Sequence, residues 1–406
     1  MDNYLYLKVS IAVAVFLCSS CNNQSQKKYD MGSYGYDVQF LADKKIEILE
    51  LSDNNGEAKL LIAPGYQGRV MTSTAAGNGG DSYGWINYKL LESGEVLPNF
   101  NPVGGEERFW LGPEGGPFSL YFKQGAEQDY KNWLVPRLID TERFDIVSQE
   151  QSSISFKKEA SLVNASGFKF DMKIDRTISI LERNKVSSLF GISISESAKM
   201  VAYSTDNILT NTGGESWTKE KGLVSIWLLC MFTPTPTTTV FIPYNTNTEG
   251  VIVNDDYFGK VPEDRLRVEN GMIYFKIDGK YRSKIGVPAG RAGSICGSYD
   301  SEKKVLTLLK YTVPEGDVSY VNSKWGPQDE SYNGDVINAY NDGPTDDGTI
   351  MGPFYEIETS SPGAELAPGE QIRHIQNVVH IQTDEKEIAD IVWKLFQLKL
   401  SQLKIE

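Results

Sequence analysis

Residues 104–118 read Gly104-Gly105-Glu106-Glu107-Arg108-Phe109-Trp110-Leu111-Gly112-Pro113-Glu114-Gly115-Gly116-Pro117-Phe118. In an extended segment alternate side chains point to one face, so Glu106, Arg108 and Trp110 are expected to lie together. An acid and a guanidinium can hydrogen-bond neighbouring hydroxyl groups, and a flat aromatic ring can stack on the C–H face of a sugar. The glycines let the backbone turn sharply and approach a ligand closely. The alternative is a glycine-rich turn region with a buried Glu–Arg pair and a core tryptophan.

Most of the chain after residue 35 is predicted to form β-strands. Apolar residues alternate with polar ones in many segments, as at Phe168, Phe170 and Met172, which indicates strands with one buried face. No repeat of roughly 20–50 residues suggests a propeller, and no strand–helix alternation suggests a parallel α/β fold. The sequence therefore predicts an all-β fold larger than an immunoglobulin-sized sandwich. The expected strands are 45–51, 58–63, 69–74, 118–123, 152–159, 168–181, 185–195, 223–232, 237–244, 272–277, 303–313, 350–359 and 371–382.

The N-terminus has the features of a bacterial export signal. Lys8 precedes an apolar run that is too short to span a bilayer, and small residues then lead to Cys21. This ending resembles a lipobox, so residues 1–20 are expected to be a lipoprotein signal peptide and 21–28 a polar tether after lipidated Cys21. The alternative is an ordinary signal that is cleaved without lipidation. The expected location is the bacterial cell envelope, in the outer membrane and facing the periplasm or the cell surface.

No linker divides the chain after the tether, and residues 29–383 are interpreted as one β unit. Residues 384–406 are predicted to form an amphipathic helix packed on that unit. Asp384 is a natural N-cap, with Glu387 as its capping-box partner. Apolar residues then recur at helical spacing, up to and including Leu403.

Composition excludes some classes of function. The net charge of −14 argues against nucleic acid, whose binding proteins carry basic patches. The chain has only two histidines, His374 and His380, so histidine-based chemistry has few candidates. Cys230 and Cys296 could form a disulfide in an oxidising compartment, and the sequence does not decide whether they do.

A second informative stretch is 351–374. If it begins as a strand, Glu356 and Glu358 face the same way, together with Ser360. Two carboxylates on one strand face are costly to bury without partners, so they are expected to meet water, cations or a polar ligand. In a cleft their pKa values would be pushed apart, as acid–base chemistry requires.

Here the sequence resembles a known family. A strand that ends in Glu358-Thr359, followed by Leu366-Ala367-Pro368-Gly369-Glu370 and His374, is similar to the C-terminal end of galactose mutarotases, also called aldose 1-epimerases. Residues 104–114 are similar to the Gly-Gly-x-x-x-x-Trp-x-x-Pro-Glu/Gln segment of the mutarotase-like superfamily. The whole chain resembles a branch of bacterial lipoproteins with that fold and no assigned activity. The resemblance implies a β-supersandwich, a large antiparallel two-layer fold with a sugar site on a concave face.

The resemblance also implies roles for particular residues. Glu358 best matches the glutamate that takes the proton from the anomeric hydroxyl, with Glu356 as its neighbour. The family's mid-chain histidine, which protonates the ring oxygen, has no counterpart here, because no histidine lies between Cys21 and His374. His374 matches a C-terminal histidine of the family that is not the proton donor. The catalytic pair is therefore incomplete, which argues against ordinary mutarotase activity.

Other candidates come from polar loops. Trp217 and Asn341 are candidate sugar contacts, as is Lys284, besides Glu106, Arg108, Trp110 and Glu114. Asp342, Asp346 and Asp347 form an acidic run that could hold Ca²⁺, although its spacing is not that of an EF-hand. No other cofactor is expected.

Three functions follow from these observations. The first is a lipid-anchored protein that binds a mono- or oligosaccharide through an acidic and aromatic cleft. The second is a sugar-active enzyme, either an epimerase with a replaced proton donor or a glycosidase or lyase with a pair of carboxylates. The third is a structural envelope protein in which the glutamates and arginines form only internal ion pairs.

Overall fold

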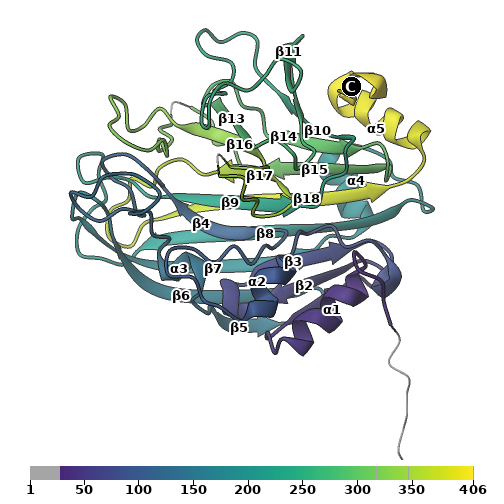
Figure 1. The fold of residues 1–406 in the computed structure, drawn as a ribbon, viewed down its shortest axis with the longest axis horizontal. Coiled ribbons are helices and arrows are strands. Elements are labelled where there is room, and N and C mark those ends of the chain that lie inside the picture. Colours follow the sequence, from purple (N-terminus) through teal and green to yellow (C-terminus); the bar gives the residue numbers. More distant parts are fainter. Residues whose placement is uncertain (1–27, 317, 346, 406) are drawn as a thin grey trace, which may run out of the picture.

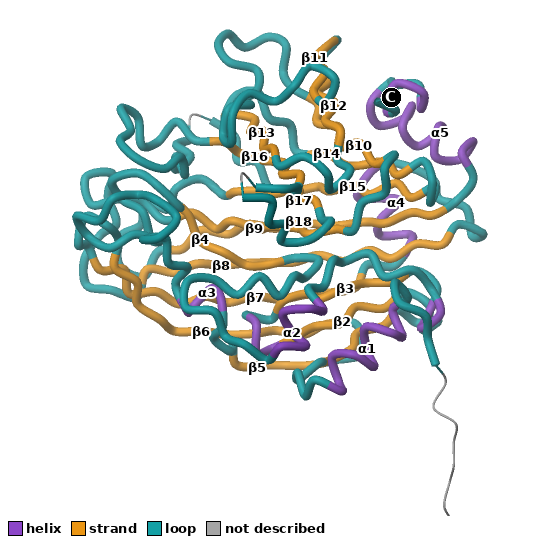
Figure 2. Tube along the Cα trace, viewed as in Figure 1, coloured by secondary structure: helices purple, strands orange, loops and turns teal. Residues whose placement is uncertain are grey.

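The computed structural model describes residues 28–316, 318–345 and 347–405. The expected signal peptide, Cys21 and most of the tether lie outside these residues. Figure 1 shows strands crossing the middle of the molecule, with the helices at its periphery. Figure 2 shows that long loops gather at one end of the sheets and above them.

Two antiparallel sheets form the two layers. The larger has ten strands in the order β11-β12-β10-β14-β15-β18-β8-β7-β6-β5, and the smaller has five in the order β13-β16-β17-β9-β4. The ten strands are β5 (Asp145–Gln149), β6 (Ser153–Val163), β7 (Lys169–Ile180), β8 (Lys199–Asn211), β10 (Thr238–Pro243), β11 (Leu266–Glu269), β12 (Met272–Lys276), β14 (Ile295–Asp300), β15 (Val305–Tyr311) and β18 (Gln371–Gln382). The five are β4 (Arg108–Gly112), β9 (Ser225–Phe232), β13 (Ser283–Pro288), β16 (Asp335–Asn341) and β17 (Tyr355–Ser360).

A third sheet and several short helices complete the fold. The sheet has three strands, β1 (Leu49–Ser52), β2 (Lys59–Ala63) and β3 (Arg69–Thr74). The helices are α1 (Tyr34–Asp43), α2 (Tyr88–Ser93), α3 (Arg137–Asp140), α4 (Arg183–Phe190) and α5 (Glu385–Phe396), with 3-10 turns at Pro64–Tyr66, Gly77–Gly79 and Leu400–Leu403. None of the helices in the described part of the chain has both the length and the apolar character needed to cross a membrane.

The main core lies between the two large sheets. Strand β7 shows the predicted alternation, with every second residue from Phe170 to Ile180 buried. From the other layer, Cys230 of β9 and Thr359 of β17 reach Gln376 of β18 through hydrogen bonds of 3.2 and 2.7 Å. The opposite face of the ten-stranded sheet is covered by α4 and α5, whose apolar residues form a second core with β8, β15 and β18. One face of the five-stranded sheet is therefore committed to the core.

The structure corrects three local predictions. Residues 118–123 form turns rather than a strand, and the segment predicted as strand 185–195 contains the end of α4. Val186 and Phe190, four residues apart, are both buried by this helix, which is helical spacing that a short apolar run did not reveal. The C-terminal helix begins at the predicted cap, where the Asp384 side chain accepts from the Glu387 amide. It ends at Phe396 because Gln397 is left-handed, with φ 56°, so Leu403 lies in a separate 3-10 turn.

Candidate functional site

The outer face of the five-stranded sheet carries polar and aromatic side chains. Paired residues of neighbouring antiparallel strands point to the same face. Arg108 of β4 is opposite Leu229 of β9, which is opposite Glu358 of β17. Trp110 is likewise opposite Trp227. We call this surface the polar face; it consists of Arg108, Trp110, Trp227, Lys284, Asn338, Glu356 and Glu358.

Each carboxylate of the polar face is paired with a cation. The Arg108 guanidinium forms an ion pair with Glu356, which is 248 residues away in the chain. Lys284 Nζ of the edge strand β13 lies 2.9 Å from Glu358 Oε2. The same oxygen accepts a hydrogen bond of 3.0 Å from the indole Nε1 of Trp227. The predicted common face of Glu356 and Glu358, and that of Arg108 and Trp110, are thus brought together.

Three buried polar atoms of the polar face have no hydrogen-bond partner among the described residues. They are Glu358 Oε1, Arg108 Nε and Trp110 Nε1. An unsatisfied buried donor or acceptor costs about 1–3 kcal/mol, and such groups are few in native proteins. The three atoms are one acceptor and two donors. The Arg108 guanidinium lies 4.8 Å from the Trp110 ring centroid. Trp227, whose indole donates to Glu358, connects Glu358 with Trp110, because the centroids of the two tryptophan rings are 5.7 Å apart.

Glu114 lies at the rim of the polar face and is half-buried. Burial raises its pKa to about 7, while the Lys284 ammonium opposes the rise and the Glu358 carboxylate adds to it. Burial also raises the pKa of Glu356, against the opposing charge of Arg108. The rim therefore holds a carboxyl group that exchanges its proton near neutral pH.

Two loops flank the polar face. One pairs with the edge strand β13, where the backbone groups of Asn254 and Gly286 exchange hydrogen bonds of 2.7 and 2.8 Å. This loop places the Tyr257 ring 5.6 Å from Lys284 Nζ, and the Tyr257 hydroxyl donates to Asp335.

The other loop lies on the side of β4. Its Ser323 hydroxyl accepts from the Glu114 amide at 3.1 Å, and Trp325 follows two residues later. An ion pair of 3.7 Å between Lys324 and Asp256 connects the two loops. Both side chains are exposed, so this contact contributes little stability.

Glu106 does not share the face of Arg108 and Trp110, contrary to the prediction. Strand β4 begins only at Arg108, so its alternation does not extend back to Glu106. Glu106 Oε1 instead accepts from Ser73 at 2.8 Å and from His380 Nε2 at 3.1 Å, inside the molecule.

Two other predicted contacts are also placed away from the polar face. Trp217 is 1% exposed, and its ring packs edge-on against Phe170 of β7. Asn341 is fully buried and holds the turn before β13, because its side chain accepts from the Gly279 amide and donates to the Tyr281 carbonyl. Asn341 lies three residues after Asn338 on β16, so it points to the face opposite the polar face.

The two histidines lie between the sheets. His374 Nε2 is 2.9 Å from the Thr359 hydroxyl, and burial lowers the pKa of His374 to about 3. His380 Nδ1 is 2.8 Å from Thr307 Oγ1. Neither belongs to the polar face, so neither replaces the proton donor that the resemblance calls for.

Within the part of the chain that the structure describes, the acidic run 342–347 and the two cysteines do not form the sites that the sequence left open. Asp342 accepts from Tyr340 and from the Gly352 amide, whereas Asp347 bonds within its own turn. Asp346 lies outside the described residues. The described residues contain no cluster of three or more metal-binding side chains. Cys230 and Cys296 are both buried and free, so the possible disulfide is not formed.

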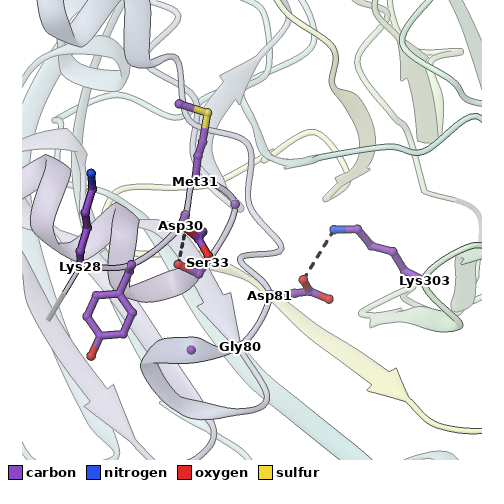
Figure 3. A pocket seen from close by; sticks show the side chains of 10 residues that line it. Lys28, Asp30, Met31, Ser33, Gly80, Asp81 and Lys303 are labelled. Atoms are coloured by element: carbon purple, nitrogen blue, oxygen red, sulfur yellow. Dashed lines mark hydrogen bonds and ion pairs between the residues drawn. The ribbon is translucent and has the colours of Figure 1, made fainter.

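A cavity of about 370 Å³ lies elsewhere, beside the first described residues. Figure 3 shows its charged groups, with an ion pair between Asp81 and Lys303 and a hydrogen bond from Ser33 to Asp30. None of the predicted site residues lines it.

Comparison with known proteins places the chain in a family. Residues 32–406 match the model of the family of unknown function DUF6786. The chain belongs to this family. No curated protein matches it.

Solved structures share the fold. The chain is similar to the Slr1438 protein from Synechocystis sp. PCC 6803, with a TM-score of 0.51 and 11% identity over 83% of this chain and 96% of that one. It is also similar to a galactose mutarotase-like protein from Lactobacillus casei (0.49, 11%, 82% and 100%). A further similar structure is a galactose mutarotase related enzyme from Lactobacillus acidophilus (0.45, 7%, 84% and 99%). The all-β mutarotase-like fold predicted from sequence is confirmed, and likeness at these identities concerns the fold alone.

Two members of the polar face, Trp227 and Asn338, were not singled out from the sequence, and Lys284 was only one of the additional candidates. Trp227 stands in the continuous apolar run 226–232, where period-two alternation is invisible. Asn338 and Lys284 lie on strands β16 and β13, which were not predicted. Asn338 is a single polar residue among apolar ones, whereas Lys284 follows two other polar residues and has no distinguishing pattern.

Proposed function

We propose that the polar face binds carbohydrate. The observation that carries this proposal is the set of unpartnered atoms, Glu358 Oε1, Arg108 Nε and Trp110 Nε1, gathered on one sheet face. A sugar hydroxyl both donates and accepts, so one or two hydroxyls would satisfy an acceptor and two donors together. The indole rings of Trp110 and Trp227 supply apolar surface beside these polar atoms.

Calorimetric titration with a panel of monosaccharides and oligosaccharides tests the proposal. Glu358→Gln is expected to weaken binding at least tenfold, because it changes the acceptor and removes the charge that Lys284 faces. Glu196→Gln is the matched control, since the Glu196 side chain is 95% exposed and pairs with Arg183, which does not belong to the polar face.

Trp110→Phe separates binding from folding. The change deletes a buried donor that has no protein partner, so no hydrogen bond within the protein is lost and the cost in stability comes only from the packing of the smaller ring among its aromatic neighbours. Glycan affinity should fall because the ligand loses that donor. Folded protein that binds no member of a broad panel would leave only the third alternative, an internal network of ion pairs.

A sugar epimerase is the second candidate, favoured by Glu114. A general acid works best with a pKa near the operating pH, and the pKa of Glu114 is about 7. Glu358 would take the anomeric proton through its free Oε1, and Glu114 would protonate the ring oxygen. Polarimetry on pure α-anomers tests this, with Glu114→Gln and Glu358→Gln expected to abolish any acceleration. A glycosidase with two carboxylates is less favoured, because both Glu356 and Glu358 are bound to cations.

We also propose that the protein is a lipid-anchored component of the bacterial cell envelope. This proposal rests on the lipobox-like sequence that ends at Cys21. Metabolic labelling with a fatty-acid analogue, compared between the wild type and Cys21→Ser, tests it. Equal labelling of both proteins would exclude lipidation at this residue.

A further inference from the structure

An exposed aromatic surface adjoins the polar face on the side of β4. Tyr130 is 71% exposed, and its ring stacks on Trp133 at 5.9 Å between centroids and 24° between planes. The Trp133 ring supports Tyr130 from below, being only 8% exposed, and lies 6.0 Å from Trp325, which is half-buried. We call Tyr130, Trp133 and Trp325 the aromatic shelf. A ligand that covers the exposed Tyr130 ring would remove its apolar surface from water, which is favourable.

Ring contacts connect the aromatic shelf with the polar face. Trp133 stacks on Tyr121 at 6.4 Å with an interplanar angle of 5°. Tyr121 lies 5.6 Å from Trp110, and Trp110 lies 5.7 Å from Trp227. A continuous series of ring contacts therefore leads from the middle of the five-stranded sheet, through the buried rings of Tyr121 and Trp133, to the exposed ring of Tyr130.

The shelf is held in place before any ligand arrives. The Gln128 side chain accepts from the amides of Gly116 and Gly326 at 2.9 and 2.8 Å and donates to the Gly116 carbonyl at 2.7 Å. It thereby ties the loop of Tyr130 to the loop of Trp325. The Asp129 carbonyl accepts from the Trp133 amide at 3.1 Å and closes the turn that presents Tyr130. Rings that are already ordered lose little entropy on binding.

The length of this surface exceeds one sugar ring. Five adjacent strands span four spacings of about 4.8 Å, or about 19 Å from β13 to β4, and the shelf extends beyond β4. Charge also selects among glycans. Above about pH 7, where Glu114 and Glu356 are ionised, the carboxylates Glu114, Glu356 and Glu358 outnumber the cations Arg108 and Lys284, and Asp335 lies beside them. A uronic acid or sulfated sugar would add like charge to this set.

We propose that the ligand is an uncharged oligosaccharide chain whose end or branch stacks on the aromatic shelf while another residue of the chain occupies the polar face. This inference rests on the carbohydrate-binding function proposed above. The shelf is a subsite separate from the polar face, and Tyr130 is its outermost contact.

The test compares chain lengths and variants by calorimetry. The probes are gluco-, galacto- and manno-configured series from the monosaccharide to the hexasaccharide, with an oligogalacturonide as the anionic probe. Affinity in the best series is expected to rise with length, and the oligogalacturonide is expected not to bind. Tyr130→Ala should lower the affinity for the longest bound member about tenfold, or about 1.4 kcal/mol, and leave that for the monosaccharide unchanged.

Trp393→Ala is the matched control. Trp393 is also an exposed aromatic residue, 53% accessible, but it lies on α5. Figure 1 shows α5 at the upper right, whereas the blue loops between α2 and α3 extend to the left. Tyr130 is exposed, so its replacement should leave the unfolding midpoint unchanged.

The outcomes distinguish the two proposals. Binding that depends on Glu358 but not on chain length or Tyr130 would overturn the shelf and leave the proposed function standing. Equal binding of the oligogalacturonide would overturn the charge selection. Absence of binding to every probe would overturn the proposed function and the inference together.

Discussion

The buried ion pair between Arg176 and Glu107 gives a sharp test of how the site is held. Glu107 directly precedes strand β4, and Arg176 lies on β7 in the opposite layer. Neither side chain has measurable exposure, and Arg176 Nη2 lies 2.8 Å from Glu107 Oε1. The pair therefore anchors the first residue of β4, Arg108, from behind. We expect Arg176→Met, which roughly preserves volume, to destabilise the protein strongly.

The magnitude follows from what the change leaves behind. Glu107 keeps hydrogen bonds of 2.7 Å from Gln376 and 3.1 Å from Thr205, but loses the ion pair with Arg176. Asn207 Oδ1 also loses a donor at 2.6 Å. Removing one partner of a buried ion pair costs about 3–5 kcal/mol, because the other charge stays buried without compensation.

Urea unfolding at neutral pH, followed by circular dichroism and tryptophan fluorescence, measures this loss as a lower midpoint at constant slope. Arg373→Met is the matched control. Arg373 pairs with Asp206 on the solvent side of β18 and β8, where the two side chains are 56% and 28% exposed, so its loss should cost less than about 1 kcal/mol. Adding Glu107→Gln to Arg176→Met should restore part of the stability, because no lone charge remains.

Equal and small losses for Arg176→Met and Arg373→Met would refute the reasoning, since they would mean that burial does not set the cost. A double variant less stable than Arg176→Met would refute the assignment of that cost to the uncompensated Glu107 charge. Glycan affinity of the stable fraction should be little changed, because neither residue lies on the polar face.

The other predictions concern pH and packing. The raised pKa of Glu114, about 7 against an ordinary 4.5, means that the folded protein holds this proton more tightly than the unfolded chain. The stability that this proton contributes is fully present below about pH 4.5 and is lost as the pH rises through about 7. The free energy of unfolding of Glu114→Gln should therefore increase relative to that of the wild type over this pH range. A difference between the two proteins that does not change with pH would contradict the assignment. Gly352→Ala would place a Cβ 2.1 Å from the Trp85 ring and should cost about 1–3 kcal/mol in urea unfolding. Gly214→Ala is the control and should cost little stability, because the added Cβ meets nothing within 4 Å and Gly214 has an ordinary φ.

Predictions of which side chains share a face were reliable where they rested on short-range periodicity within a strand. The pleat of a strand alone places Glu356 beside Glu358 and Arg108 beside Trp110 on a common face, and both placements hold. The same rule failed at Glu106, because strand β4 begins only at Arg108 and Glu106 lies outside its pleat. It also failed at 185–195, where one turn of apolar residues fits a helix as well as a strand.

The sequence by itself determined the all-β class, the alternation of β7, the cap of α5 and the local faces of both motifs, because these depend on contacts between near neighbours in the chain. Only the tertiary structure decided that Arg108 meets Glu356 and that Lys284 meets Glu358. It likewise decided that Trp217 and Asn341 point elsewhere. Strand order depends on contacts between residues that are tens to hundreds of positions apart, and no local pattern encodes which strands become neighbours. The stretch 104–118 therefore predicted a strand with polar side chains, and the neighbouring strands of the sheet contribute the residues that make it a candidate binding site.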